Sequence, residues 1–326
     1  MFNRTLFRTL LPLSFIYPFT LSAPTSKRSV NGPAINANFP DPSILQVGST
    51  WYAFGTNSNG INVQIATSED FKTWTVLKGQ DALPKTGEWS NGYNVWAPDV
   101  IQLSDDSFVL YYTAGSTQNP GLHCVGAATA STPTGPYTPA SASLACPLSQ
   151  GGAIDPAPFR DADDTLYVVY KIDGNSIGHG GLCSNTIEPI VSTPLMLQPL
   201  SADGVTPNGP AVEILDRGAA DGPLVEAPSL IRTASGNYVL FFSSSCFATS
   251  FYDVSFAVST NGIYGPYVKS SSPLLLTGMF GLNGPGGATA WTDGSHFVFH
   301  ANLEGPGGPR GMWTGEIDVQ GANVFI

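Results

Sequence analysis

One arrangement of apolar and polar residues recurs along this 326-residue chain. Each copy has a short apolar run, a polar turn and a second run rich in aromatic residues, which is the pattern of a β-hairpin. The copies lie at residues 43–55, 100–115, 157–171, 229–243 and 288–301. Residues 65–71, 127–137 and 257–267 follow three of these hairpins and predict a third strand, a turn and a fourth strand.

Four hairpins begin at an acidic residue close to a proline. The signatures are Phe39-Pro40-Asp41-Pro42, Trp96-Ala97-Pro98-Asp99, Ile154-Asp155-Pro156 and Glu226-Ala227-Pro228. Their prolines are spaced by 56, 58 and 72 residues, and Gly284-Pro285-Gly286-Gly287 marks a fifth start 57 residues further on. We interpret the signatures as placing a carboxylate at the same point of successive repeats.

Four strands repeated five times predict an all-β fold, a five-bladed β-propeller that forms one domain over residues 33–326. Abundant glycine (36) and proline (27) fit many short strands joined by tight turns. A β-sandwich with accidental internal similarity is the alternative, and five matches in phase argue against it.

The first residues are typical of a secretory signal. Arg4 and Arg8 precede an apolar stretch, and a small-residue cleavage site predicts a signal peptide over residues 1–23. Lys27-Arg28 offers a second processing point, after residue 28. We therefore expect a secreted, extracellular protein.

The charge balance restricts the partners. The formal net charge is −11, and residues 1–28 hold four cations and no acid, so their removal makes it −15. Such a surface is a poor partner for nucleic acid or an anionic membrane. A neutral oligo- or polysaccharide fits better, and we expect a monomer.

Four cysteines lie beyond the signal: Cys124, Cys146, Cys183 and Cys246. In a secreted chain an even number favours two disulfides, and three pairings are open. A metal site built from these thiols is the weaker interpretation, because the chain has no C-x-x-C spacing.

Acids that converge at one end of a propeller channel suit the hydrolysis of a glycosidic bond. One carboxylic acid protonates the leaving oxygen, and a second carboxylate attacks or activates water. A third acid near the proton donor raises the donor's pKa by like-charge repulsion. Taken singly, an Asp before proline is commonly a turn starter, and a glutamate commonly forms a salt bridge; the joint pattern favours catalysis.

The chain resembles glycoside hydrolase family 43, which includes β-xylosidases, α-L-arabinofuranosidases and arabinanases, and the four signatures above carry the resemblance over about residues 33–326. The resemblance implies an inverting mechanism with Asp41 as general base, Glu226 as general acid and Asp155 as the acid that orients the donor and raises its pKa. Inversion implies a base–acid separation of roughly 6.5–9.5 Å. Asp99 follows its proline, and we interpret it as structural.

Further residues are candidates for the sugar pocket, each with an ordinary alternative. Trp96 is either a sugar-stacking surface or a core residue. Arg310 matches the family's arginine that reaches the sugar, or lies on a surface loop. His179, in a glycine-rich loop, and Phe247, beside Cys246, are weaker candidates for substrate contact.

A central metal ion is a further hypothesis. His300 matches a histidine that helps to hold a hydrated calcium ion in arabinanase-type relatives, and a hydrogen-bonded core histidine is the alternative. Calcium prefers oxygen ligands, so water would supply most of its shell. No cofactor is required for the chemistry.

The sequence thus predicts a secreted inverting hydrolase of arabinofuranosyl or xylosyl linkages in plant cell-wall polysaccharide. We favour an α-L-arabinofuranosidase or arabinanase, because the single-domain length leaves no room for the accessory β-sandwich of many xylosidase relatives. A β-xylosidase, a galactan-directed hydrolase and a non-catalytic carbohydrate-binding propeller are the alternatives. A fructoside hydrolase fits less well, because the Asn-Asp-Pro start of those propellers is missing.

Overall fold

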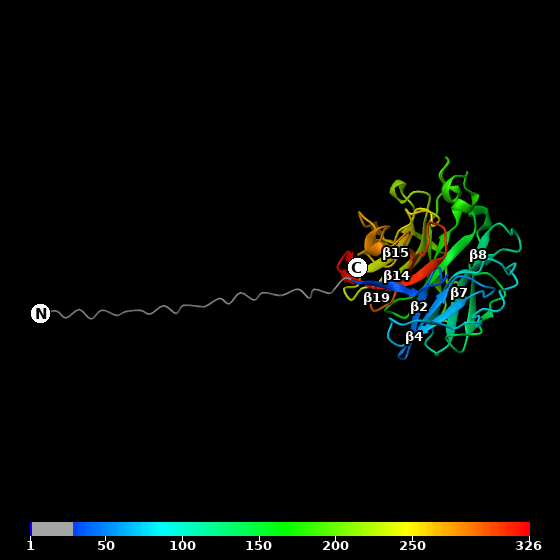
Figure 1. Ribbon diagram of the computed structural model, residues 1–326, viewed down its shortest axis with the longest axis horizontal. Helices are drawn as coiled ribbons and strands as arrows, with labels where there is room; N and C mark the ends of the chain where they lie inside the picture. The colour runs from blue at the N-terminus through cyan, green and yellow to red at the C-terminus, as the bar shows by residue number, and fades with distance from the viewer. Residues whose placement is uncertain (2–28) are drawn as a thin grey trace.

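The computed structural model describes Met1 and residues 29–326, so the expected signal peptide lies outside the described residues. Five four-stranded antiparallel sheets follow one another around a central axis and form a five-bladed propeller (Figure 1). This arrangement confirms the fold predicted from the hairpin repeat. No helix among the described residues has the length and apolar character needed to cross a membrane.

Four blades are built from consecutive strands. Blade one contains β2 (Ser43–Val47), β3 (Thr50–Gly55), β4 (Gln64–Ser68) and β5 (Thr75–Val76). Blade two contains β6 (Trp96–Gln102), β7 (Phe108–Gly115), β8 (His123–Ala130) and β9 (Thr138–Pro139). Blade three contains β10 (Ala153–Arg160), β11 (Leu166–Ile172), β12 (Leu195–Leu200) and β13 (Val212–Leu215). Blade four contains β14 (Val225–Arg232), β15 (Tyr238–Ser244), β16 (Ser255–Ser259) and β17 (Val268–Lys269).

Blade five joins the two ends of the described chain. Its strands are β18 (Gly286–Ala290), β19 (His296–Asn302), β20 (Arg310–Glu316) and β1 (Val30–Ile35). Val30 on β1 pairs with Gly315 on β20, and Ile35 pairs with Met312. The first strand is therefore the outermost strand of the last blade, and it begins ahead of residue 33.

The remaining elements are short. A ribbon of β21 (Asp318–Gln320) and β22 (Asn323–Phe325) follows blade five. Five 3₁₀ turns lie in the loops: η1 (Leu148–Gln150), η2 (Gly174–Ile177), η3 (Leu182–Ser184), η4 (Ala219–Asp221) and η5 (Met279–Gly281).

The core lies between neighbouring blades. One cluster joins Phe159 and Leu197 of blade three to Leu240 and Phe242 of blade four. Because both faces of a blade are covered, inner strands such as β7 are buried along their whole length. Their sequences therefore read as continuous apolar runs, without the alternation of a half-exposed strand.

The four cysteines form two disulfides, Cys124–Cys146 and Cys183–Cys246. The first lies within blade two and the segment that follows it. The second joins the loop after β11 to the loop after β15, and so connects blades three and four.

A kink with a positive φ angle marks every blade start. The residues concerned are Asp41 (φ 51°), Ala97 (42°), Asp155 (56°), Ala227 (51°) and Gly287 (55°). In blades two to five the strand register shifts at this point, which is the sign of a β-bulge. A left-handed conformation costs a non-glycine residue about 1–3 kcal/mol, so the fold holds these residues against their local preference.

The kink corrects the expectation that the signatures place their acids at one equivalent point. Asp41 and Asp155 are themselves the left-handed residues, whereas Glu226 lies one position before its kink and Asp99 two positions after. The four acids therefore occupy three different positions relative to the kink.

Candidate active site

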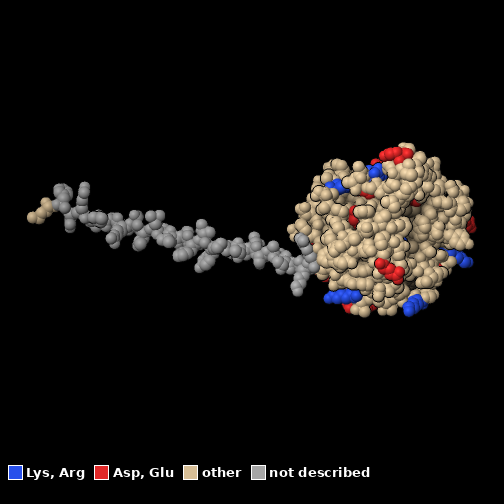
Figure 2. Space-filling model, turned by 45° about the horizontal axis from the view of Figure 1, so that its top comes forward, with Lys and Arg blue, Asp and Glu red and all other residues tan. Residues whose placement is uncertain are grey.

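A cavity of about 310 Å³ lies where four of the blade starts meet. Its volume is at the lower end of the range of small-molecule sites. The residues that line it are Asp41, Thr56, Trp96, Ala97, Ile154, Asp155, Glu226, Ala227, Phe247, Tyr252 and Arg310. The three acids predicted as catalytic thus come from blades one, three and four to a single cavity. Figure 2 shows only a few, separate charged groups on the face of the protein that it draws.

Asp41 lies in the most strongly polar corner of the cavity. Arg310 Nη1 donates to its Oδ1 at 3.0 Å, and the Thr56 hydroxyl donates to its Oδ2 at 2.6 Å. Burial alone would raise the pKa of Asp41, but the Arg310 charge and the hydrogen bonds outweigh it and hold the pKa well below its usual range. Asp41 is therefore a carboxylate at neutral pH.

His300 supports Asp41 from behind. The backbone N–H of Asp41 donates to His300 Nδ1 at 3.1 Å. Burial and the charge of Arg310 lower the pKa of His300 to about 4. The 3.3 Å approach of Nδ1 to the Asp41 carboxylate is therefore not an ion pair. The imidazole also stacks on the ring of Tyr252, with ring centroids 5.8 Å apart.

Asp155 is the second carboxyl group. Its Oδ2 accepts the N–H of Ala227 at 2.9 Å, and its own N–H donates to the Thr113 hydroxyl at 3.0 Å. Burial, reinforced by the charge of Glu226 and opposed by that of Lys171, raises the pKa of Asp155 to about 8. Asp155 therefore holds a proton more readily than an ordinary aspartate, in contrast to Asp41.

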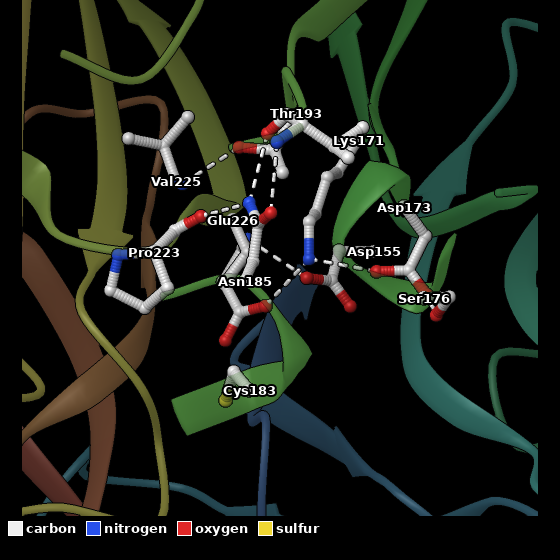
Figure 3. A network of polar contacts seen from close by, with 12 residues as sticks. Asp155, Lys171, Asp173, Ser176, Cys183, Asn185, Thr193, Pro223, Val225 and Glu226 are labelled. Atoms are coloured by element: carbon white, nitrogen blue, oxygen red, sulfur yellow. Dashed lines mark hydrogen bonds and ion pairs between the residues drawn. The ribbon is translucent and has the colours of Figure 1, made fainter. Parts of the chain in front are cut away.

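Glu226, which is 8% exposed, has a polar partner on each carboxylate oxygen. The Tyr252 hydroxyl donates to Oε1 at 2.9 Å, and Lys171 Nζ donates to Oε2 at 3.0 Å. Figure 3 shows the Lys171 ammonium beside the carboxyl groups of Glu226 and Asp155. The side chain is thus fixed in one orientation at the wall of the cavity.

Aromatic side chains form two further walls. Trp96 occupies the position before the kink of blade two, as Glu226 does in blade four, and its ring lies 4.1 Å from that of His123. Phe247 lies under the guanidinium of Arg310 at 5.3 Å and is 43% exposed. An aromatic surface opposite carboxyl groups suits a sugar ring, which has apolar faces and a polar rim.

His179, predicted to contact the substrate, and Asp99, interpreted as structural, both lie outside the cavity. His179 is exposed, its Nδ1 lies 2.7 Å from the carbonyl of Pro189, and it does not line the cavity. Asp99 is buried below the cavity, along the channel. Burial raises the pKa of Asp99 to about 8.

Three residues that contact the acids were not predicted: Thr56, Lys171 and Tyr252. Lys171 is the one charged residue of β11, whose sequence is LYVVYKI, and a lone charge in an apolar strand was a usable signal. Thr56 and Tyr252 lie in polar stretches that give no such signal.

The chemistry of the site requires no cofactor. The described residues include no group of three or more His, Cys, Asp or Glu side chains placed to hold a metal ion. His300 Nε2 is buried without a partner in the described chain, and a single imidazole nitrogen is too few protein ligands to hold a metal ion directly. The described residues therefore do not fit a metal ion held by protein ligands alone.

A five-bladed propeller whose blade starts direct three carboxyl groups into one cavity has the architecture of a glycoside hydrolase. The chain belongs to glycosyl hydrolases family 43, whose family model matches residues 30–315.

Individual relatives are distant. An extracellular endo-α-(1→5)-L-arabinanase of Thermotoga petrophila is 29% identical over 185 residues, which are 48% of this chain and 37% of that protein. The chain thus spans well under half of that relative. Extracellular endo-α-(1→5)-L-arabinanase 1 of Bacillus subtilis is 28% identical over 255 residues, 75% of this chain and 72% of that protein. The crystal structure of a thermostable family-43 glycoside hydrolase has a TM-score of 0.72 at 23% identity, covering 89% of this chain and 92% of that chain, and supports the fold.

Proposed function

We propose that the protein is an inverting glycoside hydrolase that cleaves α-L-arabinofuranosyl linkages, with Asp41 as general base and Glu226 as general acid. The observation that carries the proposal is the grouping of three carboxyl groups, those of Asp41, Asp155 and Glu226, around one cavity. A general base must be ionised, and the Arg310 charge keeps the pKa of Asp41 low enough for that. A proton donor needs a proton source close by, and the raised pKa of Asp155 provides one beside Glu226.

In the proposed reaction Glu226 gives its proton to the glycosidic oxygen as the bond from that oxygen to the anomeric carbon breaks. Asp41 takes a proton from the water that attacks the opposite face of the sugar, and the anomeric configuration inverts. The electrons of the former O–H bond stay on the Glu226 carboxylate. Asp155 interacts with Glu226 electrostatically, and its raised pKa places a group that readily holds a proton beside the acid, so it supports the return of Glu226 to its acid form.

Substitution of the acids tests the assignment. Asp41→Asn and Glu226→Gln should each lower kcat by about 10²–10⁴-fold, the usual contribution of a general acid or base. Asp99→Asn is the matched control, because Asp99 is also a buried blade-start acid but does not line the cavity. Losses below about tenfold in both site variants would contradict these roles. The first anomer formed, followed by NMR, tests inversion.

The substrate is assigned by analogy. Relatives named as endo-α-(1→5)-L-arabinanases support arabinan over xylan or galactan. Purified protein should turn over linear α-(1→5)-arabinan or an aryl arabinofuranoside faster than an aryl xyloside or galactan. Faster turnover of the xyloside would favour a β-xylosidase. Sugar binding without turnover on any substrate would favour a carbohydrate-binding propeller.

We also propose a secreted monomer that acts on neutral plant cell-wall polysaccharide. The acidic composition and the extracellular relatives support secretion and a neutral substrate. N-terminal sequencing of protein from culture medium would find the mature end, and analytical ultracentrifugation would give the mass in solution.

The hypothesis of a calcium ion in the channel extends this proposal. His300 Nε2, which is buried without a partner in the described chain, would reach such an ion through water. Metal analysis and activity after EDTA treatment test it: retained calcium, or activity restored by calcium and not by magnesium, would support it. We expect EDTA to leave kcat within about twofold, because no proposed step uses a metal.

A further inference from the structure

A buried lysine connects Glu226 to the loop after β11. Lys171 has no exposed side-chain surface, and its Nζ donates to Glu226 Oε2 at 3.0 Å and to Asp173 Oδ1 at 2.9 Å. Figure 3 shows this ammonium group between the two carboxylates. Lys171 does not line the cavity, so it does not meet a bound sugar directly.

The burial of a charged lysine needs a reason. Removing an ammonium group from water costs several kcal/mol unless partners compensate it. Burial would lower the pKa of Lys171, but the charges of Asp173 and Glu226 raise it above its usual value. Lys171 is therefore a permanent positive charge, fixed in a low-dielectric environment at hydrogen-bond distance from Glu226.

The loop holds this charge in place. Asp173 is fixed by its own N–H, which donates to the Gly152 carbonyl at 2.9 Å, and by the hydroxyl of Ser176. Further along the loop, Asn185 Nδ2 donates to the Pro223 carbonyl at 2.7 Å, just before the strand that carries Glu226. The Cys183–Cys246 disulfide fastens the same loop to blade four.

We propose that Lys171 is a positioning residue for the reaction: it orients the Glu226 carboxyl and stabilises the carboxylate that forms as Glu226 releases its proton. This inference rests on the proposed acid role of Glu226. A fixed charge aimed at a site where opposite charge develops lowers the barrier without reorganisation during the step. The effect should be largest when the leaving group depends most on protonation.

Lys171→Met tests this inference, because it keeps the length of the side chain and removes its charge. The assay measures kcat and KM on aryl arabinofuranosides whose phenol leaving groups span several pKa units, and on arabinan. For poor leaving groups and arabinan we expect kcat to fall about 10- to 100-fold, the range of one charge-assisted hydrogen bond. For a dinitrophenyl leaving group the loss should stay within about threefold, with KM changed less than about twofold throughout.

Lys269→Met is the matched control. Lys269 is also ion-paired to a buried acid, Asp221, but this pair lies in blade four away from the cavity. It should lower thermal stability without any dependence on the leaving group. An equal loss of kcat for all leaving groups in Lys171→Met would mean that Lys171 only supports the fold, and would overturn the inference.

Two further variants separate the remaining outcomes. If Lys171→Met does not fold, Lys171→Gln decides, because it can still donate to Glu226 but has no charge: a leaving-group trend supports the inference and a uniform loss overturns it. Glu226→Gln tests the foundation. If its own loss is independent of the leaving group, Glu226 is not the acid and the proposed function fails, together with the inference built on it.

Discussion

Removal of Arg310 should move the acidic limb of the pH–activity profile to higher pH. Arg310 Nη1 lies 3.0 Å from Asp41 Oδ1, and both side chains are 19% exposed, so solvent screens the pair only partly. In Arg310→Met the burial of Asp41, which acts to raise its pKa, loses its main opponent. An adjacent guanidinium typically lowers a carboxyl pKa by about 1–3 units, and we expect the limb to shift upward by that amount.

The assay is kcat/KM from acidic to neutral pH, which reports the ionisation of the free enzyme. Arg310 also lines the cavity, so the substitution should weaken substrate binding at every pH. The position of the limb separates the two effects, because a lost substrate contact scales the profile without moving it. Arg232→Met is the control, since Arg232 approaches Asp161 away from the cavity. An acidic limb at the wild-type pH in Arg310→Met would refute the assignment of Asp41 as the ionised base.

Three further predictions follow from other contacts. Tyr252→Phe removes a hydrogen bond to the proposed acid and should lower kcat about 10- to 100-fold. Tyr137→Phe is the control: it loses a hydrogen bond to a backbone carbonyl outside the cavity and should keep wild-type kinetics. Burial raises the pKa of Asp99 from 3.8 to about 8, so the folded state holds this proton more tightly than the unfolded state does. The stability of the wild-type protein should therefore fall as the pH rises through this window. The thermal unfolding temperature of Asp99→Asn should fall less steeply over the same pH range. The double variant Cys183→Ser/Cys246→Ser opens a crosslink between residues 63 apart and should lose about 4 kcal/mol in denaturant titrations; a loss under about 1 kcal/mol would contradict the chain-entropy estimate.

The sequence predicts the blades better than it predicts their closure. Aromatic and apolar runs mark the inner strands because both faces of each strand are buried. β1 has the sequence VNGPAI, with three exposed residues, and its partner lies at the other end of the chain. An exposed outer strand needs no apolar pattern, so local sequence gives little sign of it.

The residues of the candidate site were also predicted better than the contacts between them. Asp41, Asp155, Glu226, Trp96, Phe247 and Arg310 all line the cavity, as expected for residues on or near the blade starts. Alignment on the prolines already shows that the acids are offset from one another, but it does not show the kink that the structure places at the residue before each proline. The partners of the acids depend on contacts between distant segments: Lys171 and Glu226 are 55 residues apart, and Asp41 and Arg310 are 269 apart. No local pattern contains that information.

The closure of blade five makes folding and the assembly of the active site one event. The chain must bring Val30 beside Gly315 before the ring is complete, a contact of high sequence separation and therefore slow to form. The same event brings His300 and Arg310 to Asp41. A propeller with an open ring would hold Glu226, Asp155 and Lys171 in blades three and four but would lack the surroundings of the base. We therefore expect only chains whose last blade has closed to be active, and partly folded chains to have no activity.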